Sequence, residues 1–314
     1  MPGTAPLRTR VYRNHHLDSR RWDRVRLRPG DVVISTSYKA GTTWTQRIVS
    51  LLVFGTDPLP GTINSLSPWI DARFHASIDA ILAVIEAQSH RRFLKSHLPL
   101  DALPYDPRVK YLYVGRDGRD VFMSLWNHYR AYNDFLYERL NTGDDLVGGP
   151  LPRCPEDIHA LFDGWVHRAS FPWELDGYPM WSHLYHVQSF WDFRRLENLH
   201  FVHFADLKAD LAGEMRRIAA FLEIPVPEER WPALVEAASF ASMKRQADVL
   251  LPELALGFQG GAQAFLYKGT NERWRSVLSA EELASYDAAV ERTLAPTCAA
   301  WLAQGGAAGE PKAL

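Results

Sequence analysis

The chain has 314 residues, of which 46% are hydrophobic and 23% charged, and 35 Lys and Arg against 37 Asp and Glu give a net charge of -2. This apolar content excludes general disorder, and the near-neutral balance argues against a nucleic-acid coat or a polybasic membrane binder. We therefore expect no nucleic acid and no membrane as partners, and any polyanion must be held by a local cluster of charges.

Two cysteines are present, Cys154 and Cys298, and neither stands in a metal-ligand spacing. This excludes a disulfide framework. The first residues lack the apolar core of a secretory signal, and the longest apolar run, residues 48–54, is too short to span a bilayer. We expect a cytoplasmic, reduced protein.

Strands and helices are expected to alternate along the chain. The apolar patterns predict strands at residues 31–35, 91–95, 109–115 and 198–204. They predict helices at residues 42–54, 117–132 and 207–222. This order indicates an α/β fold with a central parallel sheet flanked by helices, and ligands at the carboxyl ends of the strands.

No internal repeat or long linker divides the sequence. We expect a single domain over residues 1–314, with its core at about 30–300. The closing residues 303–314 are expected to form a flexible tail.

The turn after the first predicted strand, in DVVISTSYKAGTTWTQRIV, has the features of an anion site. A turn leading into a helix N-terminus points backbone N–H groups at one spot, where the helix dipole favours an anion. Gly41 allows close approach, and Thr42 and Thr43 add hydroxyl donors. No Gly-Lys-[Ser/Thr] occurs, so the loop is P-loop-like but not Walker A. An ordinary turn capped by Thr42 is the alternative; strand, lysine, glycine and paired threonines together favour the anion site.

The segment SYKAGTTW resembles the 5′-phosphosulfate loop of the cytosolic sulfotransferase family, commonly Tyr-Pro-Lys-[Ser/Ala]-Gly-Thr-Thr-Trp. That family transfers the sulfuryl group of 3′-phosphoadenosine 5′-phosphosulfate (PAPS) to a hydroxyl or amine and releases 3′,5′-adenosine bisphosphate (PAP). The resemblance implies that the lysine contacts the transferring group, the threonines hold the 5′-phosphate and the tryptophan stacks on adenine. The loop residues expected to bind PAPS are Lys39, Ala40, Gly41, Thr42, Thr43 and Trp44.

The segment VKYLYVGRDGRDVFMSLWNHY predicts a second anion site. Arg116 follows a strand and Ser124 lies about two turns into the next helix, so both can converge on one phosphate. Taken alone, Arg116 beside Asp117 is more typical of a surface ion pair. Their spacing of eight residues resembles the sulfotransferase 3′-phosphate site, which implies that Arg116 and Ser124 bind the donor.

The segment FLKSHLPL places Lys95 and His97 at the end of a short strand. An imidazole there titrates near neutral pH and can take a proton from an acceptor hydroxyl, although most histidines are ordinary core or surface residues. KSHLPL resembles the family's Lys-Thr-His-Leu-Pro segment. The resemblance implies His97 as the catalytic base, with Lys95 and Lys39 stabilising charge on the sulfuryl group and the departing phosphate.

Two C-terminal segments extend the resemblance and also depart from it. AASFASMK is similar to the family's adenine-contacting Thr-Ser-Phe-x-x-Met, and YKGTNERWRSVLS to Arg-Lys-Gly-x-x-Gly-x-Trp-Lys. Tyr267 replaces the arginine that usually grips the 3′-phosphate, and Glu272 replaces the second glycine; Arg273 is a candidate substitute for the lost charge. The further expected donor contacts are Phe204, Ser239, Phe240, Met243, Tyr267, Lys268 and Gly269.

Ten aromatic residues lie from Phe162 to Phe193. They suit a pocket for a hydroxylated apolar molecule, or they pack over the sheet. We expect as acceptor a small, largely apolar phenol or alcohol, with in-line sulfuryl transfer that needs no metal. Members of the family often form dimers, but RSVLSAEE matches their dimer segment only loosely, so a homodimer stays open.

Two alternatives stay open. A P-loop small-molecule kinase needs Mg²⁺ and a Walker Lys-[Ser/Thr], which the loop lacks, although Asp117 is placed like a metal-binding acid after a strand. A nucleotide-binding homologue with impaired catalysis is suggested by Tyr267 and Glu272.

Overall fold

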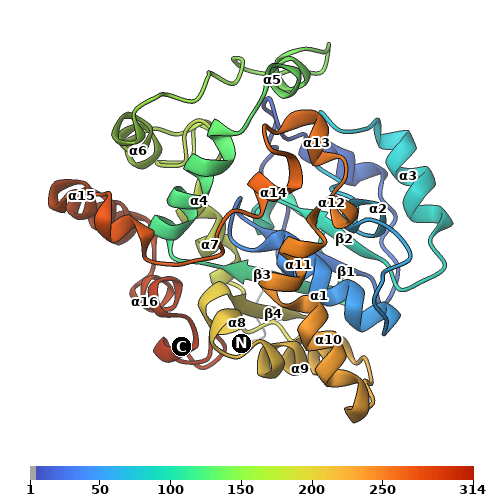
Figure 1. Ribbon diagram of the computed structural model, residues 1–314. Coiled ribbons are helices and arrows are strands. Elements are labelled where there is room, and N and C mark those ends of the chain that lie inside the picture. The colour runs from blue at the N-terminus through green and yellow to red at the C-terminus, as the bar shows by residue number, and fades with distance from the viewer. Residues whose placement is uncertain (1–4) are drawn as a thin grey trace.

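A four-stranded parallel sheet lies at the centre of the computed structural model, which describes residues 5–314 (Figure 1). The strand order is β2-β1-β3-β4, and all three neighbouring pairs are parallel. The strands are β1 (Val32–Thr36), β2 (Phe93–Ser96), β3 (Lys110–Gly115) and β4 (Leu199–His203). The predicted α/β fold class is confirmed, and each observed strand overlaps its predicted range.

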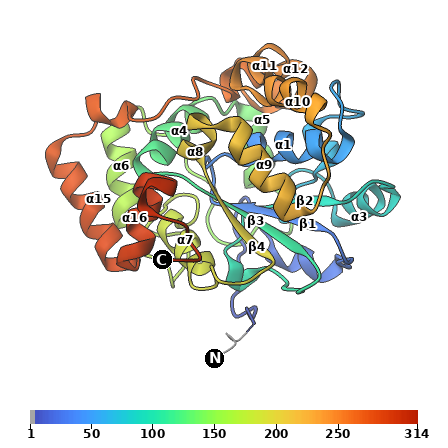
Figure 2. The same ribbon diagram turned by 90° about the horizontal axis from the view of Figure 1, so that it is seen from below.

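Helices surround the sheet and form most of the remaining structure (Figures 1 and 2). In the first half of the chain they are α1 (Thr42–Phe54), α2 (Ile63–Leu66), α3 (Ile78–Ala87), α4 (Gly118–Arg130), α5 (Asp134–Asn141) and α6 (Ile158–His167). In the second half they are α7 (His183–Trp191), α8 (Phe204–Ala209), α9 (Leu211–Leu222), α10 (Trp231–Ala238), α11 (Phe240–Arg245), α12 (Ala247–Leu250), α13 (Leu254–Gly257), α14 (Gly261–Phe265), α15 (Ala280–Thr293) and α16 (Pro296–Gln304). Short helical turns lie at Ser19–Arg24, Leu100–Ala102, Glu228–Arg230, Arg273–Ser276 and Gly305–Ala308.

Two hydrophobic cores cover the two faces of the sheet. Along β3, Tyr111 and Tyr113 belong to one core, and Leu112 and Val114 belong to the other, because successive side chains of a strand point to opposite faces. Figure 2 shows α1 and α9 on one side of the sheet and α7 on the other. Since both faces are buried, the strands are held rigidly, and the loops at their carboxyl ends are fixed with them.

The helix predicted over residues 207–222 is two helices, so that prediction is wrong in its extent. The break lies at Asp210, whose backbone is not helical (φ -143, ψ 78) and whose carboxylate accepts the Gly213 N–H at 2.8 Å. Aspartate competes with helix continuation by bonding nearby backbone groups and therefore favours helix starts. Asp210 ends α8 and caps α9.

The C-terminal residues lie against α8 and α9. The N–H of Gly306 donates to the Asp206 carboxylate at 2.8 Å, and Glu310 pairs with Arg217 at 2.7 Å. These contacts tie part of the predicted tail, residues 303–314, to the domain.

Gly115 at the end of β3 is packed against the Trp301 ring of α16. A Cβ atom at position 115 would lie 2.4 Å from that ring, and Trp301 is only 2% exposed. We predict that Gly115→Ala lowers the free energy of unfolding by about 1–3 kcal/mol, the usual cost of overpacking a core. Denaturant unfolding measures the effect. Gly149→Ala is the matched control, because nothing lies within 4 Å of its added Cβ; equal effects of the two substitutions contradict the packing argument.

Candidate active site

A cavity of about 560 Å³ opens at the carboxyl ends of the four strands. Residues that follow β1, β2, β3 and β4 all reach it, as the parallel sheet predicts. The predicted site residues that line it are Lys39, Gly41, Thr42, Thr43, Trp44, Lys95, His97, Arg116, Ser124, Phe204, Phe240, Met243, Tyr267, Lys268 and Gly269. Segments up to about 230 residues apart in the sequence are thus brought to one place.

The loop between β1 and α1 presents an open helix N-terminus to this cavity. Lys39 and Gly41 adopt left-handed backbone angles (φ 58 and 123), and Gly41 caps α1 without any side-chain hydrogen bond. The alternative of an ordinary cap by Thr42 is therefore wrong: Thr42 is the first helical residue, and its hydroxyl lies 2.5 Å from that of Thr36. The first N–H groups of a helix have no intrahelical partner, so this end can bind an anion.

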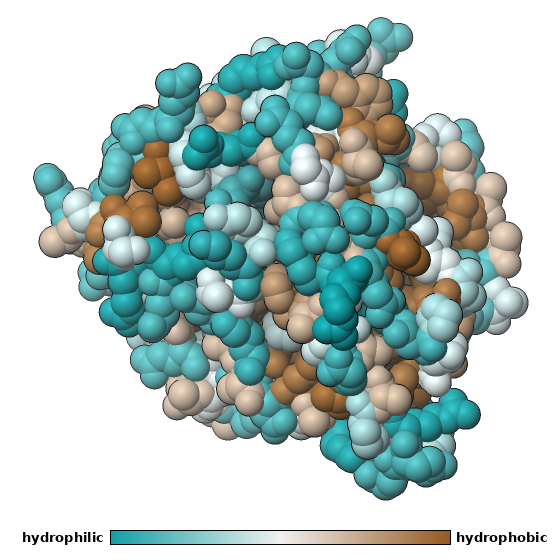
Figure 3. Space-filling view, viewed as in Figure 1, coloured by the Kyte–Doolittle hydropathy of each residue, from teal (hydrophilic) through white to brown (hydrophobic). Residues whose placement is uncertain are grey.

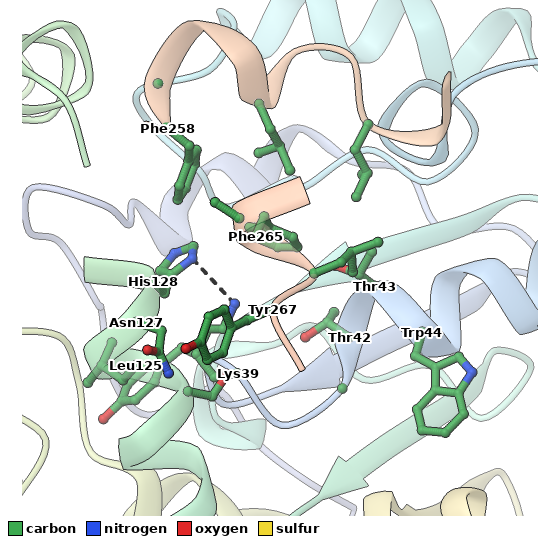
Figure 4. Close-up of a pocket in the computed structure, with 18 of the residues that line it drawn as sticks. Lys39, Thr42, Thr43, Trp44, Leu125, Asn127, His128, Phe258, Phe265 and Tyr267 are labelled. Carbon is green, nitrogen blue, oxygen red and sulfur yellow. Dashed lines mark hydrogen bonds between the residues drawn. The ribbon is translucent and has the colours of Figure 1, made fainter. Parts of the chain in front are cut away.

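Lys39 projects from this loop into the cavity. Its Nζ lies 3.3 Å from Nδ1 of His128, the dashed line of Figure 4, and 4.1 Å from the centre of the Phe265 ring. Burial, with the nearby charges of Arg116 and Lys95, lowers the pKa of Lys39 to about 7. A bound anion would therefore stabilise the charged ammonium form of Lys39.

Arg116 is a buried cation, and one of its hydrogen-bond donors is unused in the described part of the chain. Its guanidinium carbon lies 4.0 Å from the centre of the Phe204 ring. Its Nη2 donates to the Thr270 carbonyl and the Asn271 side chain, and its Nη1 donates to the Lys39 carbonyl. Within residues 5–314, its buried Nε has no hydrogen-bond partner. Burial lowers the pKa of Arg116 to about 10.

The alternative of an Arg116–Asp117 surface ion pair is wrong. Asp117 instead pairs with Arg119 at 2.6 Å and accepts the Arg119 N–H as the cap of α4. Asp117 is also not among the residues that line the cavity, so it does not fill the role of the metal-binding acid in a kinase.

His97 is held in one orientation by its surroundings. Its Nδ1 lies 2.8 Å from the Thr36 carbonyl oxygen, so Nδ1–H donates there and Nε2 is left as the basic nitrogen. The ring packs edge-on against Trp69, with centroids 4.7 Å apart. Burial and the charge of Lys95 lower the pKa of His97 well below its usual value, which keeps the imidazole neutral.

Asp71, which the sequence reasoning missed, fixes the backbone of this segment. Its carboxylate accepts the His97 N–H at 3.0 Å and the Ser96 hydroxyl at 2.7 Å. Lys95 lies beside them, its Nζ 4.5 Å from the centre of the Trp69 ring, and burial lowers its pKa to about 8.

The strip of residues 267–273 forms part of the cavity wall, and Arg116 links it to the loop by donating to the Lys39 and Thr270 carbonyls. Glu272 adopts the left-handed φ of 63, so the position where the family has glycine keeps a glycine-like backbone. Its N–H donates to Asp120 at 2.7 Å, which ties the strip to α4; Asp120 was not foreseen from the sequence. Arg273 lines the cavity, with its guanidinium carbon 4.9 Å from the Tyr267 ring.

The predicted adenine contacts divide into two groups. Trp44 packs edge-on against Phe204 at 5.3 Å and donates from Nε1 to the Ala238 carbonyl. Ser239, in contrast, caps α11 by accepting the Ser242 N–H, and it does not line the cavity. Ala40 is likewise buried in the core and absent from the lining. Donor contacts by Ser239 and Ala40 stay predictions.

The aromatic insert at residues 162–193 mostly packs the core. Of its ten aromatic residues, only Trp181 lines the cavity, whereas Trp165 donates to the Tyr38 hydroxyl at 2.7 Å inside the core. The apolar part of the cavity comes from segments that sequence reasoning did not single out. Its aromatic members there are Trp69, Phe74, Tyr132, Phe135, Phe258 and Phe265.

Across residues 5–314, the side chains of His, Cys, Asp and Glu form no group of three or more suited to a metal ion. Over the same residues, no helix is both long and apolar enough to cross a membrane.

Comparison with known structures supports the fold. Retinol dehydratase, solved in a complex with retinol and PAP, superposes with a TM-score of 0.65 at 23% identity, covering 87% of this chain and 83% of that one. Mouse sulfotransferase SULT7A1, complexed with PAP, superposes with a TM-score of 0.63 at 19% identity, covering 87% of each chain.

Sequence comparison identifies the family. A glycolipid sulfotransferase of Mycobacterium tuberculosis (strain ATCC 25618 / H37Rv) is 33% identical over 96% of both chains. Mouse sulfotransferase 1B1 is 25% identical over 88% of this chain and 87% of its own. The sulfotransferase domain family matches residues 29–298. The chain therefore belongs to the sulfotransferase family.

Proposed function

We propose that this protein transfers the sulfuryl group of PAPS to a hydroxyl of an apolar acceptor, with His97 as general base. One observation carries the proposal: a single cavity is lined both by the anion-binding loop and by a neutral, oriented histidine. PAPS is named because structures with this fold were solved with PAP and because the loop is similar to a phosphosulfate loop.

The cavity residues fit the charges of such a donor. The open N-terminus of α1, with Thr42 and Thr43, suits the 5′-phosphosulfate (Figure 4). The unpartnered Nε of Arg116 and the nearby Ser124 suit the 3′-phosphate. Trp44 supplies an aromatic face for the adenine.

The chemistry of the chain's own residues follows from their positions. Nε2 of His97 takes the proton of the acceptor hydroxyl while the hydroxyl oxygen forms a bond to the sulfur atom. At the same time the bond between sulfur and the oxygen of the 5′-phosphate breaks, and the electron pair of that bond stays on the phosphate oxygen. Lys39 and Lys95 neutralise the charge on the sulfuryl oxygens and the leaving phosphate. Positioning and preorganised charge supply most of the rate, as in phosphoryl transfer.

The acceptor class rests on the lining and on relatives. Aromatic and aliphatic side chains dominate the part of the cavity beyond His97, including Phe135, Leu136 and Phe258. The relative at 33% identity is named as a glycolipid sulfotransferase. An alcohol attached to an apolar body agrees with both.

The test is incubation of the protein with PAPS and a panel of phenols and alcohols, without added metal, followed by mass spectrometry of the products. Sulfated product supports the proposal. PAP binding without transfer to any acceptor favours the impaired homologue instead, and phosphorylated product from ATP and Mg²⁺ favours the kinase.

Removal of the proposed base should stop turnover but not donor binding. We predict that His97→Ala lowers kcat by about 10²–10⁴, the usual contribution of general base catalysis, with PAP affinity within about twofold of wild type. Steady-state kinetics and calorimetry measure the two quantities. His159→Ala, at an exposed position outside the cavity, is the control; a wild-type kcat in His97→Ala contradicts the assignment.

Arg273 should substitute for the arginine missing at position 267. We predict that Arg273→Ala raises the KM for PAPS about tenfold, because one charge-assisted hydrogen bond is lost at a half-exposed site. Arg275→Ala removes an equal charge two residues away, from a side chain 61% exposed and outside the cavity. Equal KM changes in both variants point to general electrostatics rather than a contact.

Donor affinity should depend on pH through Lys39. An anion favours the ammonium form and raises the pKa of Lys39 above its free value of about 7. Affinity is therefore greatest below pH 7, and we predict that the Kd of PAP rises about fivefold between pH 7 and pH 8. Calorimetry measures this, and Lys39→Met should show weaker binding with a flatter pH dependence. If the dependence of the PAP Kd on pH is unchanged in Lys39→Met, the proton taken up on binding belongs to another group.

A further inference from the structure

A second, smaller cavity of about 250 Å³ adjoins the proposed acceptor region. It lies between α2, α3 and the segment of residues 68–76. Its own lining is mainly apolar and comprises Ser65, Pro68, Ala76, Ala80, Ile81 and Val84.

The two cavities have walls in common. Asn64, Trp69, His75 and Glu253 line both. Trp69 is the central partition, because it lies beside the second cavity while its ring packs 4.7 Å from that of His97. The second cavity therefore begins one aromatic ring away from the proposed base.

This partition is fixed relative to the catalytic strand. The Lys95 N–H donates to the Pro68 carbonyl at 3.0 Å, and the Ile70 N–H donates to the Lys95 carbonyl at 3.1 Å. Residues 68–70 thus bond to the edge of β2 on both sides of Trp69. A group in the second cavity would be held at a set distance from His97.

One polar contact crosses the junction between the cavities. The amide of Asn64, on α2, donates to the carboxylate of Glu253, the residue before α13. Both side chains are half-buried, and neither belongs to a strand, so their separation would leave the backbone of the sheet in place.

Apolar groups continue from these cavities to the surface. Val84 of α3 is 45% exposed and forms part of the second cavity, while Leu256 of α13 is 65% exposed at the first. Figure 3 shows apolar residues gathered over α3 and over α12 and α13. Exposed apolar groups that continue a cavity mark a path for an apolar ligand.

We propose that the second cavity binds the hydrocarbon chain of the acceptor, so that the acceptor is an amphiphile with a hydroxyl at His97 and a linear tail beside α3. This rests on the sulfuryl transfer proposed above. A compact phenol fills only the first cavity, whereas a tail that passes Trp69 into the second cavity gains burial for each added methylene. The protein would then select an acceptor by the length of its hydrocarbon tail as well as by its hydroxyl group.

The test compares straight-chain primary alcohols, from ethanol through butanol and octanol to dodecanol, as acceptors with PAPS. For the wild-type protein, kcat/KM should rise about three- to fourfold for each methylene that enters the cavity and level off once it is filled. Ala80→Trp fills the second cavity from α3 and should remove this gain for octanol and dodecanol. PAP affinity and thermal unfolding report whether the variant is folded.

Ala83→Trp is the matched control, because Ala83 is exposed on the same helix but lines neither cavity. It should behave as wild type with every alcohol. A length dependence that survives in Ala80→Trp places the tail in the first cavity and overturns the proposal, as does a wild-type rate that ignores chain length. Absence of sulfated product from every alcohol and phenol, in contrast, contradicts sulfuryl transfer itself.

Discussion

Lys39, Lys95 and Arg116 are cations that share one cavity without an ion-pair partner among the described residues. Lys39, Lys95 and Arg116 all line it, and none of the three forms an ion pair within residues 5–314. Burial disfavours each charge, and the pKa values fall to about 7, 8 and 10. Nearby carboxylates offset only part of this cost: Asp120 and Asp117 act on Arg116, and Asp71 and Glu253 act on Lys95. The proposed polyanionic donor would offset the rest.

The parallel sheet holds the three cationic residues close together. Lys95 lies within β2, and Lys39 and Arg116 follow β1 and β3, so strands packed on both faces fix all three backbones near one another. Neutral partners hold the side chains instead: aromatic faces lie under all three, at 4.0–4.5 Å from the charged atoms. These contacts tolerate the charges without cancelling them, and the two carboxylates that line the cavity in the described chain, Asp120 and Glu253, form no ion pair with the three cations.

Sequence reasoning found the residues that belong to contiguous motifs and missed those brought in by tertiary packing. Lys39, Arg116 and His97 could be predicted because each follows an apolar strand within a recognisable segment. Asp71 and His128 could not, since nothing near them in the sequence indicates that they contact His97 and Lys39. Local patterns report strands and turns, but not which distant side chains complete a cavity.

The aromatic insert at residues 162–193 also shows what local sequence patterns cannot report. Its density of rings, from Phe162 to Phe193, indicated burial correctly but could not distinguish core from cavity wall, because both environments favour the same side chains. The apolar wall comes instead from scattered residues such as Trp69 and Phe258.

In the strip at residues 267–273, a residue other than glycine adopts a backbone conformation that is typical of glycine. Glu272 keeps a left-handed φ of 63 although it has a Cβ, and the Asp120 carboxylate that accepts its N–H holds it there. The strip therefore follows the path that a glycine would allow, and both Arg273 and the 44% exposed Tyr267 line the cavity. In this strip, a hydrogen bond from the Glu272 N–H to Asp120 of α4 holds a backbone conformation that glycine adopts more readily.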